Sequence, residues 1–127
     1  MDENMISREV VDAALKIHRD LGPGLLETVY EAVLAKELEI RGLKSERQVK
    51  IPISYNGLSF DEGVRADIVI DQKVVLELKS VEQLSKVHHK QLLTYLRLMN
   101  LNLGLLINFN TPLIKDGIHR VVNQLAA

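Results

Sequence analysis

The interpretation of this chain starts from residues 65–79, which read RADIVIDQKVVLELK. Two strongly apolar runs, 65–70 and 74–79, flank three polar residues at 71–73. Short apolar runs rich in Val, Ile and Leu on either side of a polar break are typical of two strands joined by a tight turn. The runs are apolar enough to predict central strands of a sheet.

Charged residues interrupt these two runs at Asp67, Glu77 and Lys79. Residues two apart in a strand share a face, so Glu77 and Lys79 point the same way. Asp67 meets Glu77 only if the turn has the right length. A two-residue loop would put the carboxylates on opposite faces, whereas a three-residue loop, at 70–72 or 71–73, keeps them together. We therefore predict a three-residue loop.

Two neighbouring carboxylates repel each other, and their burial is costly unless a cation lies between them. Oxygen ligands suit Mg²⁺ or Mn²⁺, which also accept phosphate oxygens. Lys79 could orient or deprotonate an attacking water, or neutralise a phosphate. The alternative is a hairpin with solvated charges on its outer face, which is common for such clusters. Charges set into otherwise apolar strands favour a site.

The rest of the chain alternates helical and strand patterns around this hairpin. The sequence predicts helices at 5–21, Leu25–Arg41 and Val81–Leu98, strands at Gln48–Tyr55, Leu58–Glu62 and Leu103–Phe109, and a short element at Ile118–Val122. Asn56-Gly57 is a strong hairpin signal. This order predicts an α/β fold with helices on one mixed sheet, in a single domain spanning 1–127.

Composition excludes several classes of protein. The chain has 127 residues, no cysteine and a net charge of −1. Disulfides, thiolate metal sites and cysteine nucleophiles are therefore absent. The low charge argues against coating of nucleic acid by bulk electrostatics, but it permits contact with a few phosphates. The acidic N-terminus lacks the pattern of a secretory signal, and no apolar run reaches membrane-spanning length. We expect a cytoplasmic protein without a membrane partner.

Two further motifs lie on predicted helices. Glu27 and Tyr30 are three apart and share a helix face. Taken alone, this motif is explained by a helix cap and a core tyrosine. Gln91 and Tyr95 border the apolar stripe of the third helix, and a buried glutamine needs a specific partner. His88, on the same helix, is by itself more typical of a partly buried helix histidine than of a ligand.

Together these motifs closely resemble the GxxExxY protein family, over a span from about Val10 to Val122. The matching segments are Gly24-x-x-Glu27-x-x-Tyr30, Arg65-Ala-Asp67, Glu77-Leu-Lys79, His88, Gln91-x-x-x-Tyr95, Gly104-Leu-Leu-Ile-Asn-Phe-Asn110 and Lys115-Asp-Gly117. That family is grouped with the PD-(D/E)XK, or restriction-endonuclease-like, nucleases. The resemblance implies a core of four mixed strands between helices, in the order αβββαβ, here with an extra N-terminal helix.

The resemblance also implies roles for individual residues. Asp67 and Glu77 would bind the metal, with Glu27 as the acidic residue from the first core helix, and Lys79 would be the catalytic lysine. Gln91 and Tyr95 resemble a Q-x-x-x-Y element that arranges the site and contacts substrate. Further implied substrate-binding residues are Tyr30 and His88. Ala66 stands where the signature has proline, which is a common variation.

The expected function is hydrolysis of phosphodiester bonds in nucleic acid, with DNA as the expected substrate and Mg²⁺ or Mn²⁺ as cofactor. A homodimer would double the contact with nucleic acid, although the sequence carries no direct interface signal. Two alternatives stay open: a non-catalytic module that binds nucleic acid or protein, and a hydrolase of another phosphate ester. Retention of Asp67, Glu77 and Lys79 favours catalysis.

Overall fold

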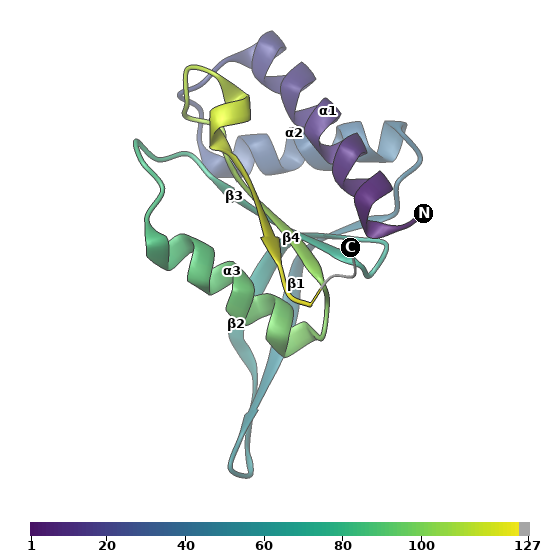
Figure 1. Cartoon of the computed structure of the whole chain (residues 1–127), viewed down its shortest axis with the longest axis vertical. Helices are drawn as coiled ribbons and strands as arrows, with labels where there is room; N and C mark the ends of the chain where they lie inside the picture. The colour runs from purple at the N-terminus through teal and green to yellow at the C-terminus, as the bar shows by residue number, and fades with distance from the viewer. Residues whose placement is uncertain (125–127) are drawn as a thin grey trace.

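The computed structural model describes residues 1–124 and, at Glu62, the backbone alone. Helices and strands follow in the order α1 (Glu3–Leu21), α2 (Glu27–Ile40), β1 (Ser45–Tyr55), β2 (Leu58–Ile70), β3 (Val74–Lys79), α3 (Lys86–Met99), β4 (Leu103–Asn108), the 3₁₀ helix η1 (Ile114–Gly117) and β5 (Ile118–Val122). The predicted α/β class and the restriction-endonuclease-like order of elements are confirmed (Figure 1).

The strands form one mixed sheet in the order β1-β2-β3-β4-β5. Only β3 and β4 are parallel, and the other neighbours are antiparallel. The predicted sheet of four strands was one strand short, because the short element at Ile118–Val122 pairs with β4 as a fifth strand. The predicted strands at Leu58–Glu62 and Arg65–Ile70 are one continuous strand, β2.

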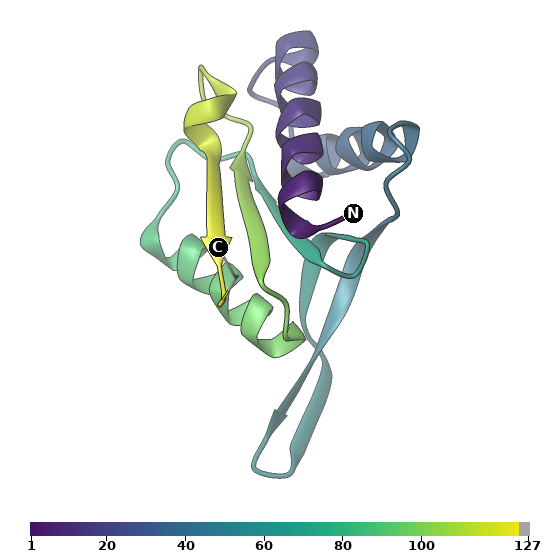
Figure 2. The same ribbon diagram turned by 45° about the vertical axis from the view of Figure 1, so that its right-hand side comes forward.

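Helices cover both faces of the sheet, with α1 and α2 on one face and α3 on the other (Figures 1 and 2). The first core packs α1 and α2 against apolar side chains of β2, β3 and β4. The second packs Leu92, Tyr95 and Leu96 of α3 against β1 to β4. Because β3 and β4 carry apolar residues on both faces, they read as continuous hydrophobic runs in the sequence.

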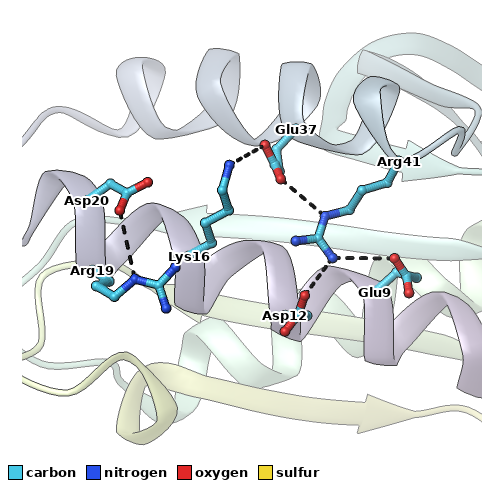
Figure 3. Close-up of polar contacts among 7 residues, drawn as sticks. All are labelled: Glu9, Asp12, Lys16, Arg19, Asp20, Glu37 and Arg41. Atoms are coloured by element: carbon cyan, nitrogen blue, oxygen red, sulfur yellow. Dashed lines mark hydrogen bonds and ion pairs between the residues drawn. The ribbon is translucent and has the colours of Figure 1, made fainter.

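Ion pairs join α1 to α2 (Figure 3). Arg41 donates to Glu9, Asp12 and Glu37 at 3.3, 2.7 and 3.3 Å, and Lys16 donates to the second oxygen of Glu37 at 3.3 Å. We call these five residues the Arg41 cluster. The Arg41 cluster therefore links α1 to α2 on this face of the sheet.

Among the helix ends that differ from the predicted ones, two starts are explained by polar side chains. The first helix begins at Glu3, where Asp2 accepts a hydrogen bond from the Met5 N–H at 2.8 Å. The third begins at Lys86 rather than Val81. Residues 81–85 form a loop instead, since Asn108 exchanges two hydrogen bonds with the backbone of Val81.

The β1–β2 hairpin extends beyond the rest of the molecule as a two-stranded arm, residues 53–60 (Figures 1 and 2). Tyr55 pairs with Leu58 and Ile53 pairs with Phe60, so these apolar side chains lie on one face of the arm. Tyr55, Leu58 and Phe60 are exposed. None of the helices within residues 1–124 is long and apolar enough to cross a membrane.

Candidate functional site

The turn between β2 and β3 has the predicted length. Ile70 pairs with Val74 and Ile68 pairs with Leu76, which leaves a three-residue loop at 71–73. This register sets Asp67 opposite Glu77, one step beyond the last paired residues. The prediction that the two carboxylates face each other is therefore confirmed.

The backbone pairing of β2 with β3 ends at Ile68 and Leu76. Beyond that pair, hydrogen bonds between backbone N–H groups and carboxylates join the two strands. The Asp67 N–H donates to Oε1 of Glu77 at 3.0 Å, and the Leu78 N–H donates to Oδ2 of Asp67 at 2.8 Å. Each carboxylate thus accepts a backbone N–H from the opposite strand. We call Asp67, Glu77 and Leu78 the β2–β3 seam. The sheet backbone, rather than a loop, holds both acidic groups in place.

The seam is an unfavourable place for two negative charges. Glu77 is 5% exposed, and burial together with the charge of Asp67 raises its pKa to about 8. Burial also raises the pKa of Asp67, and the charge of Glu31 adds to this, against the opposing effect of the Leu78 hydrogen bond. The pair therefore favours a shared proton or a cation.

Lys79 is the last residue of β3 and is half-buried. Its charge lowers the pKa values of both Asp67 and Glu77, which places the ammonium within electrostatic reach of the pair. Strand alternation thus sets Glu77 and Lys79 on one face at the end of β3, beside Asp67 of β2.

Glu27 lies in the first turn of α2 and is exposed. Its Oε1 accepts the N–H of Ser80 at 3.2 Å, and its charge contributes to the raised pKa of Glu77. The Ser80 hydroxyl also donates to the Leu25 carbonyl at 2.6 Å, so the start of α2 is fixed against the end of β3. Glu27 therefore lies beside the pair, at the rim of the site.

The third helix contributes Tyr95, which is 7% exposed. Burial raises the pKa of its hydroxyl, and the charges of Glu77 and Asp67 add to this effect. The Tyr95 hydroxyl therefore lies within electrostatic reach of the two carboxylates. Gln91, one turn earlier, is exposed. The side chain of His88 caps α3, with Nδ1 accepting the N–H of Ser85 at 3.1 Å, and so takes part in helix structure.

Tyr30 does not reach any surface open to substrate. It is fully buried, its ring stacks on Phe109 with centroids 4.4 Å apart, and its hydroxyl donates to the Gly22 carbonyl at 2.6 Å. The same hydroxyl accepts the N–H of Leu25 at 3.2 Å. The substrate-binding role predicted for Tyr30 is replaced by a structural one, which is to anchor the loop between α1 and α2.

Sequence reasoning missed two residues beside the pair. Glu31, 6% exposed, accepts hydrogen bonds from Arg47 at 3.1 and 2.8 Å and from Gln48 at 2.6 Å. The same Gln48 nitrogen donates to Oδ1 of Asp67 at 3.3 Å. Glu31 lies one turn after Glu27, and this i, i+4 relation is the only signal that could have drawn attention to it.

The seam fits a divalent cation of the magnesium type. Within residues 1–124 no three His, Cys, Asp or Glu side chains are gathered closely enough to hold a metal by themselves. Mg²⁺ does not require that, because it is commonly held by one or two carboxylates, waters and substrate phosphates. Asp67 and Glu77 supply two carboxylates whose oxygens retain further acceptor capacity. A cation would also relieve the repulsion that raises the pKa of Glu77.

Comparisons with known proteins agree with this geometry. A family model described as PD-(D/E)XK nuclease superfamily matches residues 4–121. Among solved structures, the chain is similar to one described as "Crystal structure of SSO0001", with a TM-score of 0.58 and 26% sequence identity. That match covers 78% of this chain and 50% of the other, so the chain spans about half the length of that structure. No curated protein matches the chain.

Proposed function

Because the chain belongs to the PD-(D/E)XK nuclease superfamily, we propose that it is a Mg²⁺- or Mn²⁺-dependent nuclease that hydrolyses phosphodiester bonds of nucleic acid, with DNA as the preferred substrate. The observation that supports this proposal most is that Asp67 and Glu77 each accept a backbone N–H from the opposite strand of the β2–β3 seam, which brings the two carboxylates together. Members of the superfamily are generally nucleases, and a buried acidic pair followed by lysine is the chemistry that such a reaction needs.

Asp67 and Glu77 hold the cation in this proposal, with Glu27 as the acidic side chain at the rim. When bound, a divalent cation polarises a phosphoryl oxygen and makes water more acidic. Lys79 either orients and deprotonates the attacking water or donates to a phosphate oxygen, since its ammonium lies in the field of both carboxylates.

Substrate contacts come from α3 in this proposal. Tyr95 keeps its hydroxyl protonated because its pKa is raised, so it serves as a donor toward a phosphate or a water. Gln91, exposed one turn earlier on the same helix face, helps to arrange the site and to contact substrate in this proposal. A homodimer would place two such sites on one duplex.

The test is a cleavage assay with purified protein in Mg²⁺ and in Mn²⁺. Single-stranded, duplex and branched DNA are compared with RNA, beside the variants Asp67→Ala and Lys79→Ala. We expect metal-dependent cleavage of DNA that is lost in both variants. The same protein titrated with Mn²⁺ in a calorimeter reports metal binding separately from cleavage.

Each outcome distinguishes the candidate functions. Cleavage by Asp67→Ala at the wild-type rate would refute the proposed site. Binding of Mn²⁺ without cleavage of any nucleic acid would shift the substrate to another phosphate ester. A wild-type protein that neither binds metal nor cleaves would be a binding module that retains the nuclease fold.

A further inference from the structure

A glutamine lies between two carboxylates at the rim of the seam. The side-chain nitrogen of Gln48 donates to Oε1 of Glu31 at 2.6 Å and to Oδ1 of Asp67 at 3.3 Å. Ionised carboxylates only accept hydrogen bonds, so the amide must turn its NH₂ group, with two hydrogens, toward them. Gln48 therefore uses both donors of its amide to separate two negative groups.

Arg47 completes the arrangement from the other side. Its Nε and one terminal nitrogen donate to Oε2 of Glu31 at 3.1 and 2.8 Å. Glu31 is 6% exposed, and this fork-shaped contact compensates its charge. With Arg47 on one oxygen and Gln48 on the other, the Glu31 carboxylate is fixed and in turn fixes the amide of Gln48.

The backbone at Gln48 is held in an unusual conformation to make this contact. Gln48 has φ of 51°, in the left-handed region, although it lies inside strand β1. The register of β1 with β2, with Arg47 opposite Ile68 and Val49 opposite Ala66, sets Gln48 opposite Asp67. A left-handed residue other than glycine is strained, and such strain is found where the surroundings require it, often at functional sites.

These contacts of Gln48 restrict the orientation of the Asp67 carboxylate. Its Oδ2 is held by the Leu78 N–H and its Oδ1 by Gln48, so both oxygens have a fixed donor. We infer that Gln48, backed by Glu31 and Arg47, is a positioning residue that orients the Asp67 carboxylate for metal binding. This inference rests on the proposed function for its metal-binding part. Its geometric part, the fixed orientation of Asp67, is independent of any metal.

The experiment compares Gln48→Gly with Gln72→Gly. Gln72 is a matched control because it is also a glutamine with a left-handed backbone, φ 54°, and it lies exposed in the β2–β3 turn. Glycine relieves the backbone strain at both positions. Only the substitution at position 48 removes the donor to Asp67. A second variant, Gln48→Asn, tolerates the left-handed backbone but has an amide one methylene too short to bridge both carboxylates.

Two measurements are made on each protein. Calorimetric titration with Mn²⁺ should give an affinity about 10–100-fold weaker for Gln48→Gly than for the wild type, the usual effect of losing a group that orients a ligand. Amide hydrogen exchange of the metal-free protein should be faster at Leu78, because its acceptor on Asp67 is no longer fixed. Amides of α1, which are hydrogen-bonded within their own helix and contribute no residue to the seam, report any general loss of stability. Gln72→Gly should match the wild type in both measurements.

Unchanged exchange at Leu78 relative to α1 in both Gln48 variants would overturn the inference, as would wild-type Mn²⁺ affinity in these variants. If the wild-type protein itself bound no Mn²⁺, the proposed function would fail, whereas the exchange at Leu78 would still decide whether Gln48 orients Asp67. The two failures are therefore distinguishable.

Discussion

Two groups of charged side chains lie in different parts of this molecule and differ in their balance of charge. In the Arg41 cluster, the cations Arg41 and Lys16 contact three carboxylates between the exposed sides of α1 and α2 (Figure 3). Burial alone would raise the pKa of Glu37, but hydrogen bonds from Lys16 and Arg41 outweigh it and lower the pKa. The hydrogen bond to Asp12 raises the pKa of Arg41. Glu37 and Arg41 are thus both stabilised in their charged forms.

The β2–β3 seam has the opposite balance. Asp67 and Glu77 are more deeply buried, they face each other, and their pKa values are raised. The charge of Lys79 and the hydrogen bonds to the two carboxylates offset this increase in part. A cluster whose positive and negative charges stabilise each other contributes to folding. Buried carboxylates whose charged forms are destabilised are more typical of a functional site. The predictions below test this distinction, from the largest expected effect to the smallest.

The largest expected difference is in catalysis. Lys79→Ala should lower the rate of DNA cleavage by about 10²–10⁴-fold, which is the usual contribution of a positioned acid or base. Arg41→Ala should leave the rate unchanged, because the Arg41 cluster has no contact with the seam. Cleavage rates at saturating Mg²⁺ measure both. An equal loss of rate in the two variants would remove the distinction between the clusters.

The second difference is in pH dependence. The pKa of Glu77 is raised from 4.5 to about 8, so between these values the folded protein binds more protons than the unfolded one. The free energy of unfolding should therefore fall as pH rises through this window, by on the order of 3 kcal/mol between pH 5 and 8 without metal. Glu77→Gln should remove that slope in urea titrations. Glu37, with its lowered pKa, is ionised throughout and adds no slope.

The third difference is in the response to metal. Saturation with Mn²⁺ at 100 times its dissociation constant should raise the free energy of unfolding by about 2.7 kcal/mol. This gain should disappear in Asp67→Asn and persist in Arg41→Ala, as measured by urea unfolding at pH 7 with and without Mn²⁺. A gain that survives in Asp67→Asn would place the cation elsewhere.

The smallest effects are expected in the Arg41 cluster itself. Arg41→Ala removes three ion pairs and leaves Glu37 without one of its donors, which should cost about 1–2 kcal/mol of stability. Lys16→Ala removes a more exposed pair, and roughly 0.5 kcal/mol or less is expected. Urea unfolding at low and at high salt checks both, because screening should reduce the two costs. A larger cost for Lys16→Ala than for Arg41→Ala would contradict this order.

The two strands of the central hairpin could be predicted from local sequence, whereas the length of their turn was predicted from the need to bring the two carboxylates together. The alternation of side chains and the length of the turn together place Asp67 opposite Glu77. The fifth strand was missed because its residues, Ile118–Val122, are few and its pairing with β4 is a long-range property. The single strand β2 was divided in the prediction because the polar residues around Gly63 resemble a break.

The surroundings of the pair could not be predicted. Glu31 and Gln48 meet only after α2 and β1 have packed, and no spacing rule connects residues 17 apart on different elements. The left-handed backbone of Gln48 has no sequence signal, since glutamine carries no preference for it. Tyr30 illustrates the opposite error, because a tyrosine in a recognised motif can equally be a buried anchor.

The position of the turn at 71–73, between the two residues of the acidic pair, also limits which insertions and deletions this turn can accept. Surface turns ordinarily accept single-residue insertions and deletions without much consequence. Here, a change of one residue that shifts the pairing of β2 with β3 would carry Asp67 away from Glu77. We therefore expect natural insertions and deletions in this turn to involve two residues rather than one. The length of this exposed turn is thus constrained by the site that it positions.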